Sequence, residues 1–432
     1  MESGEQPPKK TGTITRRGLL GAVVAGGAGY ALKKFFGTQD ASATENHPLK
    51  QLVVPNIATD AEHPPEVWDT EKFETTLQHA ISESISKQKA VELYLPQGEV
   101  RIKKNLKFDM QDARVSLVGN GTILSLDESL SDIPKEWASE GHNLLEFNNV
   151  TGDIMIKGIR FDGGSKRAGK GGYAPPGGPW DAVLFVNGGG PGSGKDIPNG
   201  HRDLKRSGSV TVEDCEFVDS EAPGFLAKNL KKASIERAKG ENLDTLFVAD
   251  WCDEITANNL QARNCLSEGV GVYGCYGGSI TNCDVTTARQ GFLIHGCDNI
   301  VVSDCTVEDA AIGYVFDQAG VNNKPNSNLM VRNSNSQGTV LAYAMAHSQE
   351  VGIENSRHEE MGTWLAKFND GNGDFLHTGI ADIGNITAIQ QPLWLGSGTE
   401  SVTFSDVVLK KATDSHYYTH PREIPGIKNE GF

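Results

Sequence analysis

Hydrophobic and polar residues alternate in a unit that recurs along the chain. The segment Ser-Val-Thr-Val-Glu-Asp-Cys-Glu-Phe at 209–217 returns as Asn-Ile-Val-Val-Ser-Asp-Cys-Thr-Val at 299–307. Equivalent positions follow one another at intervals of 23, 22, 23, 22, 29, 22, 30 and 21 residues. They are Cys215, Ala238, Leu260, Cys283, Cys305, Ser334, Ser356, Ile386 and Val407. A near-constant step that is lengthened twice predicts a solenoid with loops inserted at particular corners.

One step of the repeat contains three short apolar segments. Val210 and Val212 alternate with polar residues, and Phe217 follows after a tight corner. A third segment is commonly opened by glycine, as at 269–274 and 291–296. Three strands of period-two alternation, joined by polar corners, make one turn of a parallel β-helix.

The residue before each aligned position is nearly always Asn or Asp. These residues are Asp214, Arg237, Asn259, Asn282, Asp304, Asn333, Asn355, Asn385 and Asp406. Asn and Asp tolerate left-handed backbone at a corner and can hydrogen-bond their stacked neighbours. Helical and leucine-rich repeats do not require such a column. We therefore predict an all-β chain with three-strand coils of about 22 residues.

The stretch before the repeats predicts an amphipathic helix from Asp69 to about Lys89, which Asp69 can cap. One face carries apolar side chains, namely Phe73, Leu77, Ala80, Ile81 and Ile85. A strand, a turn and a second strand then follow between 91 and 102.

The turn reads Leu95-Pro96-Gln97-Gly98-Glu99-Val100. With the helix before it, this opening resembles that of the pectate-lyase-like superfamily, whose members commonly plug the core with a helix and continue through an "LPxGxY" turn. Val100 stands where the aromatic residue usually falls. The resemblance covers 69–412 and implies a right-handed parallel β-helix of PbH1-type repeats with an N-terminal capping helix. It specifies a fold rather than an activity.

The N-terminus has the pattern of a targeting segment. Arg16-Arg17 precede a Gly/Ala-rich run that ends before Lys33-Lys34, and Ala41-Ser42-Ala43 would serve as a cleavage site. Twin arginines before a weakly apolar stretch resemble a Tat export signal, and the stretch is shorter than the roughly 20 residues of a membrane span. We assign 1–43 as a Tat-type signal or uncleaved anchor, 44–68 as a linker, 69–412 as the β-helix and 413–432 as a tail.

All seven cysteines lie between 215 and 305. Cys252, Cys275 and Cys297 are 23 and 22 residues apart, and Cys283 and Cys305 are 22 apart, which predicts stacking on adjacent coils. The absence of Cys-x-x-Cys spacing argues against zinc. We expect buried thiols that act as small core or corner residues. A disulfide within the column of Cys252, Cys275 and Cys297 is the alternative in an oxidising compartment.

Charge gives one candidate binding region. The net charge of −16 argues against nucleic acid as a partner. The longest interruption of the repeat, 163–207, nevertheless has seven Lys and Arg against three Asp. It carries Arg167, Lys170 and Arg202 and could bind an acidic polysaccharide. The alternative interpretation is a solvated loop.

Members of the resembled superfamily commonly hold substrate along one sheet. The glycine-led strands are the candidates for that sheet, with Phe225/Ala227, Val270/Val272, Phe292/Ile294 and Tyr314/Phe316 facing inward. The predicted outward row is Lys228, Ala249, Tyr273, His295 and Asp317, with Lys367 further along. We expect His295 to act as base, with its pKa raised by Asp317, Tyr273 to act as acid, and Lys228 or Lys367 to neutralise a uronate carboxylate. Ordinary polar residues on a solvated sheet would give the same pattern.

Three tryptophans are further candidates for contact with a sugar substrate. Trp251, Trp364 and Trp394 end or lie within candidate strands and could stack on sugar rings or pack at corners. No cofactor is expected: pectate lyases often bind calcium through clustered acidic residues, and only Asp250 and Asp317 fall near this row. Those two lie three coils apart, roughly 14 Å, which is too far for a hydrolase pair.

Together these observations favour an exported monomer, outside the cell or on its surface, that binds and cleaves an acidic polysaccharide by β-elimination. It would meet a membrane only through an uncleaved N-terminal segment. A non-catalytic adhesion protein, a polygalacturonase-like hydrolase and a uronate epimerase remain alternatives.

Overall fold

The computed structural model describes residues 12–14, 68–127, 143–164, 182–188, 206–220, 222–317, 325–361, 393–395, 399, 401–411 and 423–430. The predicted sites at Arg167, Lys170, Arg202, Trp364 and Lys367 lie outside these residues. Trp394 falls in strand β26, but its side chain is outside the description.

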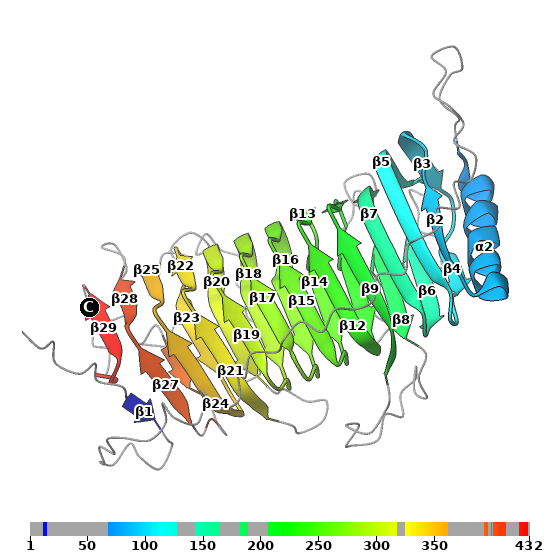
Figure 1. Cartoon of the computed structure of the whole chain (residues 1–432). Coiled ribbons are helices and arrows are strands. Elements are labelled where there is room, and N and C mark those ends of the chain that lie inside the picture. Colours follow the sequence, from blue (N-terminus) through cyan, green and yellow to red (C-terminus); the bar gives the residue numbers. More distant parts are fainter. Residues whose placement is uncertain are drawn as a thin grey trace, which may run out of the picture.

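The described strands stack as the coils of a parallel β-helix, in which each strand pairs with its counterpart one coil away (Figure 1). Three ladders run the length of the molecule, and we call them sheets A, B and C. Sheet A contains β2 (Ala90–Tyr94), the first parts of β5 (Arg114–Leu126) and β7 (Asp153–Asp162), β9 (Ser207–Glu213), β12 (Leu230–Glu236), β15 (Glu254–Asn258), β17 (Gly278–Thr281), β19 (Ile300–Ser303), β21 (Asn326–Arg332), β24 (Ser348–Glu354) and β27 (Val402–Ser405).

Sheet B follows sheet A in each coil. It contains β3 (Gly98–Ile102), the second parts of β5 and β7, β10 (Glu216–Val218), β13 (Lys239–Glu241), the first parts of β16 (Gln261–Tyr273), β18 (Asp284–His295) and β20 (Thr306–Asp317), β22 (Asn335–Gln337), β25 (Arg357–Met361), β28 (Val407–Lys411) and β29 (Ile427–Glu430). β29 falls in the stretch assigned as a tail, so part of that stretch adds a strand to the solenoid.

Sheet C completes each coil. It contains β4 (Leu106–Asp109), β6 (Leu145–Val150), β8 (Leu184–Gly188), β11 (Phe225–Lys228), β14 (Phe247–Asp250), the second parts of β16, β18 and β20, β23 (Leu341–Met345) and β26 (Leu393–Leu395). β8 lies inside the stretch interpreted as one long insertion, so that stretch contains a strand of its own.

The helix α2 (Thr70–Lys87) packs against the first coil and covers that end of the core (Figure 1). The Asp69 carboxylate accepts a hydrogen bond from the Lys72 backbone N–H and caps the helix, as the sequence predicts. At the opposite end, β1 (Gly12–Ile14) pairs antiparallel with β27. Among the described helices, none has the length and apolar character of a membrane span.

The Asx column occupies the corner between sheets A and B. All of its described members, including Arg237, have φ between 49° and 56°. Asn333 Nδ2 donates to Asp304 Oδ1 one coil away, and Arg237 Nε donates to Asp214 Oδ1. Left-handed backbone at one position per coil turns the chain, which is why residues that tolerate it recur there.

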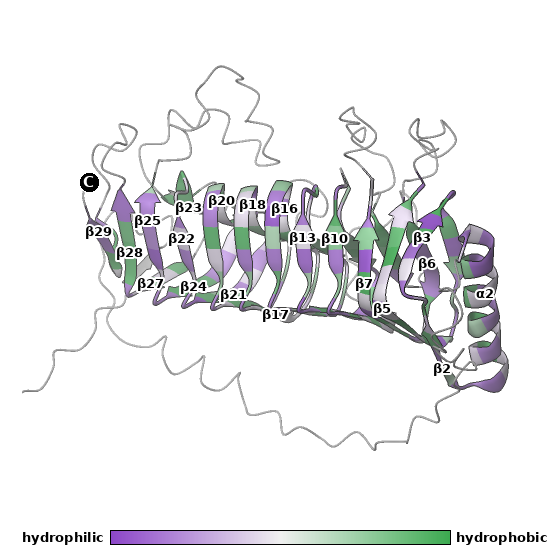
Figure 2. Ribbon diagram, turned by 90° about the horizontal axis from the view of Figure 1, so that it is seen from above, coloured by the Kyte–Doolittle hydropathy of each residue, from purple (hydrophilic) through white to green (hydrophobic). Residues whose placement is uncertain are grey.

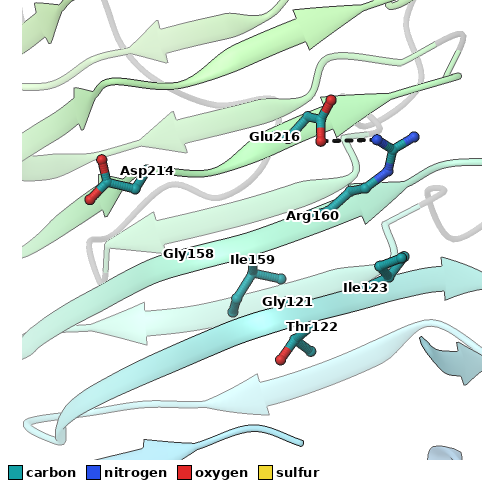
Figure 3. Close-up of a pocket in the computed structure, with 8 residues that line it drawn as sticks. All are labelled: Gly121, Thr122, Ile123, Gly158, Ile159, Arg160, Asp214 and Glu216. Atoms are coloured by element: carbon teal, nitrogen blue, oxygen red, sulfur yellow. Dashed lines mark hydrogen bonds and ion pairs between the residues drawn. The ribbon is translucent and has the colours of Figure 1, made fainter. Parts of the chain in front are cut away.

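In the first coils glycine occupies this corner, and the missing side chains leave a hollow. Gly121 and Gly158 have φ of 72° and 66° and line it together with Arg160 and Glu216, which form an ion pair of 2.9 Å (Figure 3). The hollow lies on the outer side of sheet B. Arg160 and Glu216 are 41% and 40% exposed, as in an ordinary surface ion pair, so the hollow carries no candidate chemistry.

The core is apolar and continuous from coil to coil, and hydrophilic and hydrophobic positions alternate along the strands (Figure 2). The inward positions predicted for the glycine-led strands are confirmed, from Phe225 at 0% exposure to Phe316 at 1%. Phe292 stacks on Tyr314 with ring centroids 5.4 Å apart. These stacks run along the helix axis because equivalent residues of adjacent coils lie about 4.8 Å apart.

The cysteine columns are confirmed, and all seven cysteines are buried and free rather than paired in a disulfide. The Cys252 backbone N–H donates to Cys275 Sγ, and the Cys275 N–H donates to Cys297 Sγ, each over 3.3 Å. The Cys297 N–H in turn donates to Asn326 Oδ1 over 2.8 Å. Cys275, Cys297 and Asn326 therefore each accept a backbone hydrogen bond from the preceding coil.

This column predicts how Cys297 tolerates substitution. Cys297→Ser keeps an acceptor for the buried Cys275 N–H, whereas Cys297→Ala leaves that N–H without one. We expect Cys297→Ala to lower the free energy of unfolding by about 1–3 kcal/mol more than Cys297→Ser does. Urea unfolding of both variants measures the difference. Equal stabilities would show that the thiol serves only as a space-filling group.

Candidate active site on sheet C

A row of polar residues ends the strands of sheet C on their outer side. The strand pairing aligns Lys228 with Asp250, Asp250 with Tyr273, Tyr273 with His295, and His295 with Asp317. The register agrees with the predicted positions of Lys228, Tyr273, His295 and Asp317, and Lys367 lies outside the described residues. Ala249 is wrong, because it is fully buried and pairs with Ala227 and Val272, so Asp250 takes its place. Counting back 22 or 23 residues from Tyr273 identifies Asp250, so the spacing contained this information.

The row is shielded rather than solvated. The side chains of Lys228, Asp250 and Asp317 are 22%, 13% and 6% exposed. Nearby outward residues form a second apolar cluster, separate from the core, of Ala182, Leu226 and Val248 with Phe185 and Tyr273 packed against it. The row therefore does not lie on an open, solvated sheet face.

Lys228 and Asp250 form an ion pair, with Nζ 2.8 Å from Oδ2. Burial raises the pKa of Asp250, and the Lys228 ammonium opposes that shift. A carboxylate that is costly to keep charged accepts a proton more readily than an ordinary Asp. When Asp250 takes up a proton, the Lys228 ammonium group loses its negatively charged partner.

His295 lies between two carboxylates, Asp250 and Asp317. The pKa of His295 is nevertheless lowered, because burial outweighs the attraction of both. The expected upward shift is therefore wrong. Its cause, the neighbouring Asp317, is present, but desolvation is the larger effect. The imidazole is neutral at neutral pH, which is the form that accepts a proton.

Tyr273 lies flat along its strand instead of standing outward. A methyl group placed on Gly271 would come 2.9 Å from Tyr273 Cε2 and 3.4 Å from its hydroxyl, so the ring occupies the space that glycine leaves. The ring centroids of Tyr273 and His295 are 5.6 Å apart at 42°. Burial raises the pKa of Tyr273 well above its usual value, and the carboxylates of Glu268, Asp244 and Asp250 add to the rise. The phenol therefore keeps its proton.

Trp251 follows Asp250 at the corner between sheets C and A. Its φ of 56° is unusual for a bulky side chain, and Gly274 and Gly296 occupy the same corner in the next coils. A methyl group on Gly274 would come 3.0 Å from the indole, so the Trp251 ring lies over this glycine beside the row.

Two further features escaped the sequence analysis. His347 Nδ1 lies 3.9 Å from Asp317 Oδ1 and extends the row by one coil. At the other end of the same strands, Asp244 and Glu268 both contact the Thr245 hydroxyl. The signal available for the second group was an acidic residue shortly before each of two consecutive sheet C strands, whereas the predicted row comprises residues at the strand ends.

Metal ligands do not gather in the described part of the chain: no three His, Cys, Asp or Glu side chains lie together there as a metal site would require.

Comparisons with known proteins concern the fold. No curated protein sequence matches this chain. The A-module of the mannuronan C-5 epimerase AlgE4 of Azotobacter vinelandii is 12% identical, covers 84% of this chain and 91% of its own length, and gives a TM-score of 0.45. The enzymatically active domain of tailspike protein 2 of bacteriophage CBA120 is 12% identical. The match covers 77% of this chain and 44% of that domain's chain, with a TM-score of 0.41. The surface adhesin PfbA of Streptococcus pneumoniae is 7% identical. The match covers 78% of this chain and 90% of PfbA, with a TM-score of 0.38.

A family model described as right handed beta helix region matches residues 246–380, so the coils are those of a right-handed parallel β-helix.

Proposed function

We propose that the protein binds an acidic polysaccharide along the outer side of sheet C and cleaves it by β-elimination. One observation carries the proposal: the imidazole of His295 and the phenol of Tyr273 lie side by side, with ring centroids 5.6 Å apart, on a row that also carries the Lys228 ammonium group. Base, acid and cation are the three groups that elimination from a uronate requires.

In the proposed reaction, Lys367 or a loop arginine pairs with the carboxylate of the reacting uronate and makes its C5 proton more acidic. Lys228 lies three coils from His295, so it would bind the carboxylate of a neighbouring sugar. His295 takes the C5 proton, the C4=C5 double bond forms, and the C4–O4 bond breaks. Tyr273 gives its proton to the leaving O4. The products are a shorter chain and one that ends in an unsaturated uronate. Trp251 would stack on a neighbouring sugar ring.

The alternatives need arrangements that the described residues do not offer. A hydrolase needs two carboxyl groups that flank the scissile bond at about 5–9.5 Å. Asp250 and Asp317 are three coils apart, and Asp244 and Glu268 contact one buried hydroxyl instead of flanking a space. An epimerase must return a proton to the opposite side of C5, whereas His295 and Tyr273 both belong to sheet C.

Binding would be completed by groups outside the described residues. Arg167, Lys170 and Arg202 are proposed to hold the acidic polymer, and Trp364, Trp394 and Lys367 to extend the contact. Export by the Tat-type segment would bring the protein to such polymers outside the cell.

An ultraviolet assay tests the proposal. Purified protein is mixed with each of a panel of uronate polysaccharides, and the absorbance of the conjugated C4=C5 double bond is followed. A rise on one polymer is the expected result and names the substrate. A flat trace on every polymer, accompanied by new reducing ends, would replace elimination by hydrolysis. A flat trace without new ends would leave a binding protein.

A further inference from the structure

A second group of titratable residues lies at the start of the sheet C strands. Thr245 Oγ1 is 3.1 Å from Asp244 Oδ2 and 3.0 Å from Glu268 Oε2. Thr245 and Glu268 are only 1% and 6% exposed. Because one hydroxyl has one hydrogen, it cannot fully satisfy two carboxylates. Two negative groups are thus held close together in a poorly solvated place.

The electrostatics agree with this geometry. The pKa of Asp244 is raised to about 6, first by burial and then by the charge of Glu268, while Thr245 and Arg289 oppose the shift. Cys265 and Tyr273 also lie within the influence of both carboxylates. Above about pH 6 Asp244 is therefore negatively charged, and below that pH it takes up a proton.

The pair has an unsatisfied polar neighbour. The Cα atom of Gln290 pairs with that of Glu268 on the adjacent coil, so the two side chains stand on the same side of the sheet. Gln290 is 1% exposed, and its Oε1 has no hydrogen-bond partner among the described residues. A buried acceptor without a donor is costly, so the surroundings of the pair solvate its negative charges poorly.

Tyr273 connects this group to the proposed catalytic row. Its ring lies over Gly271, two residues back along β16, and its hydroxyl would come 3.4 Å from a methyl group placed there. The phenol has His295 beside its ring, and the charges of Glu268 and Asp244 act on it. A negative charge on the phenol oxygen would be repelled by both carboxylates.

We propose that Asp244 and Glu268 are positioning residues whose charge adds to burial in disfavouring the phenolate form of Tyr273, which supports Tyr273 as the proton donor and His295 as the base. This assignment rests on the proposed function. It implies that the direction of proton flow is fixed by groups that do not touch the scissile bond, at the far end of the strands.

The test follows the ionisation of residue 273 directly and needs no substrate. Tyr273 is replaced in the full chain by 3,5-difluorotyrosine, whose phenol ionises closer to neutral pH, and the ¹⁹F signal is titrated. The same titration is made with Asp244→Asn and Glu268→Gln. Glu241→Gln, an exposed carboxylate on sheet B, is the matched control.

We expect Asp244→Asn and Glu268→Gln each to move the midpoint to lower pH by roughly one unit, a tenfold change in the phenolate-to-phenol ratio. Glu241→Gln should leave the midpoint unchanged. Midpoints that coincide with that of the parent protein in both variants would overturn the proposal, as would an equal shift in Glu241→Gln. Circular dichroism checks that each variant is folded. If one of the two variants does not fold, the other one decides the question.

The two proposals fail separately. A shifted titration with a flat ultraviolet assay would retain the positioning pair and reject elimination. An unshifted titration with a positive ultraviolet assay would reject the pair and retain elimination.

Discussion

His295→Ala is expected to lower kcat/KM on the cleaved polysaccharide by roughly 10²–10⁴-fold, the usual contribution of a positioned general base. The loss should be in kcat, because the imidazole acts on the C5 proton and not on substrate binding. The initial rate of ultraviolet absorbance increase measures it. His79→Ala is the matched control, since His79 is an exposed histidine on α2. A His295→Ala enzyme with full activity would remove His295 from the mechanism.

The pH profile examines the same assignment. The pKa of His295 is lowered by burial and partly restored by Asp317 and Asp250. A base with a lowered pKa stays active in more acidic solution, so the acidic limb of the rate profile should lie below the ordinary histidine value of about 6.5. Asp317→Asn removes a group that favours the protonated imidazole, so the limb should move to still lower pH. A limb that moves upward would contradict this electrostatic account.

The repeat predicts most of the fold because one physical requirement acts at every coil. The separate coil predicted at Ile386 is wrong, since the strand pairing places Val407 one coil from Ser356. A left-handed corner residue such as Asn282 and an inward apolar residue such as Phe292 are needed once per turn, so the spacing of residue types reveals the coil. Strand β8 and strand β29 escaped this reasoning because each lies apart from the regular series, one within the long interruption of the repeat and one beyond its end.

The candidate site follows from the sequence only in part. Spacing brings Tyr273, His295 and Asp317 into one row, because adjacent coils are in register. The orientation of Tyr273 depends on the missing side chain of Gly271, and the lowered pKa of His295 depends on how deeply the row is buried. Burial is set by packing between distant segments, which period-two alternation does not describe. The pair of Asp244 and Glu268 meets through one hydroxyl, that of Thr245, and no spacing rule contains that contact.

A buried histidine outside the site is expected to make the fold sensitive to acid. His358 points into the core, with Nδ1 2.7 Å from Ser336 Oγ and Nε2 2.7 Å from the Tyr343 hydroxyl. It is fully buried, and burial lowers its pKa to about 3. The unfolded chain takes up a proton at this residue as pH falls through about 6.5, whereas the folded chain does not until about pH 3.

Folding is therefore penalised increasingly as pH falls between these two values, and His358 contributes no such penalty above about pH 6.5. At about 1.4 kcal/mol per pH unit, the free energy of unfolding should lose on the order of 4–5 kcal/mol through this one residue by about pH 3. The matched variant is His358→Gln, which keeps hydrogen-bonding groups but does not titrate. It should be less stable at neutral pH because it loses the edge-on ring contact with Tyr343, 4.7 Å between centroids.

Urea unfolding of both proteins at a series of pH values between neutral and about pH 4 separates the two effects. The difference in stability between the parent protein and His358→Gln should shrink steadily as the pH falls below about 6.5, because only the parent pays for keeping a neutral histidine. The carboxylates common to both proteins cancel in this difference. A difference that stays constant with pH would show that His358 is protonated in the folded state, and that its contacts with Ser336 and Tyr343 accommodate the charge.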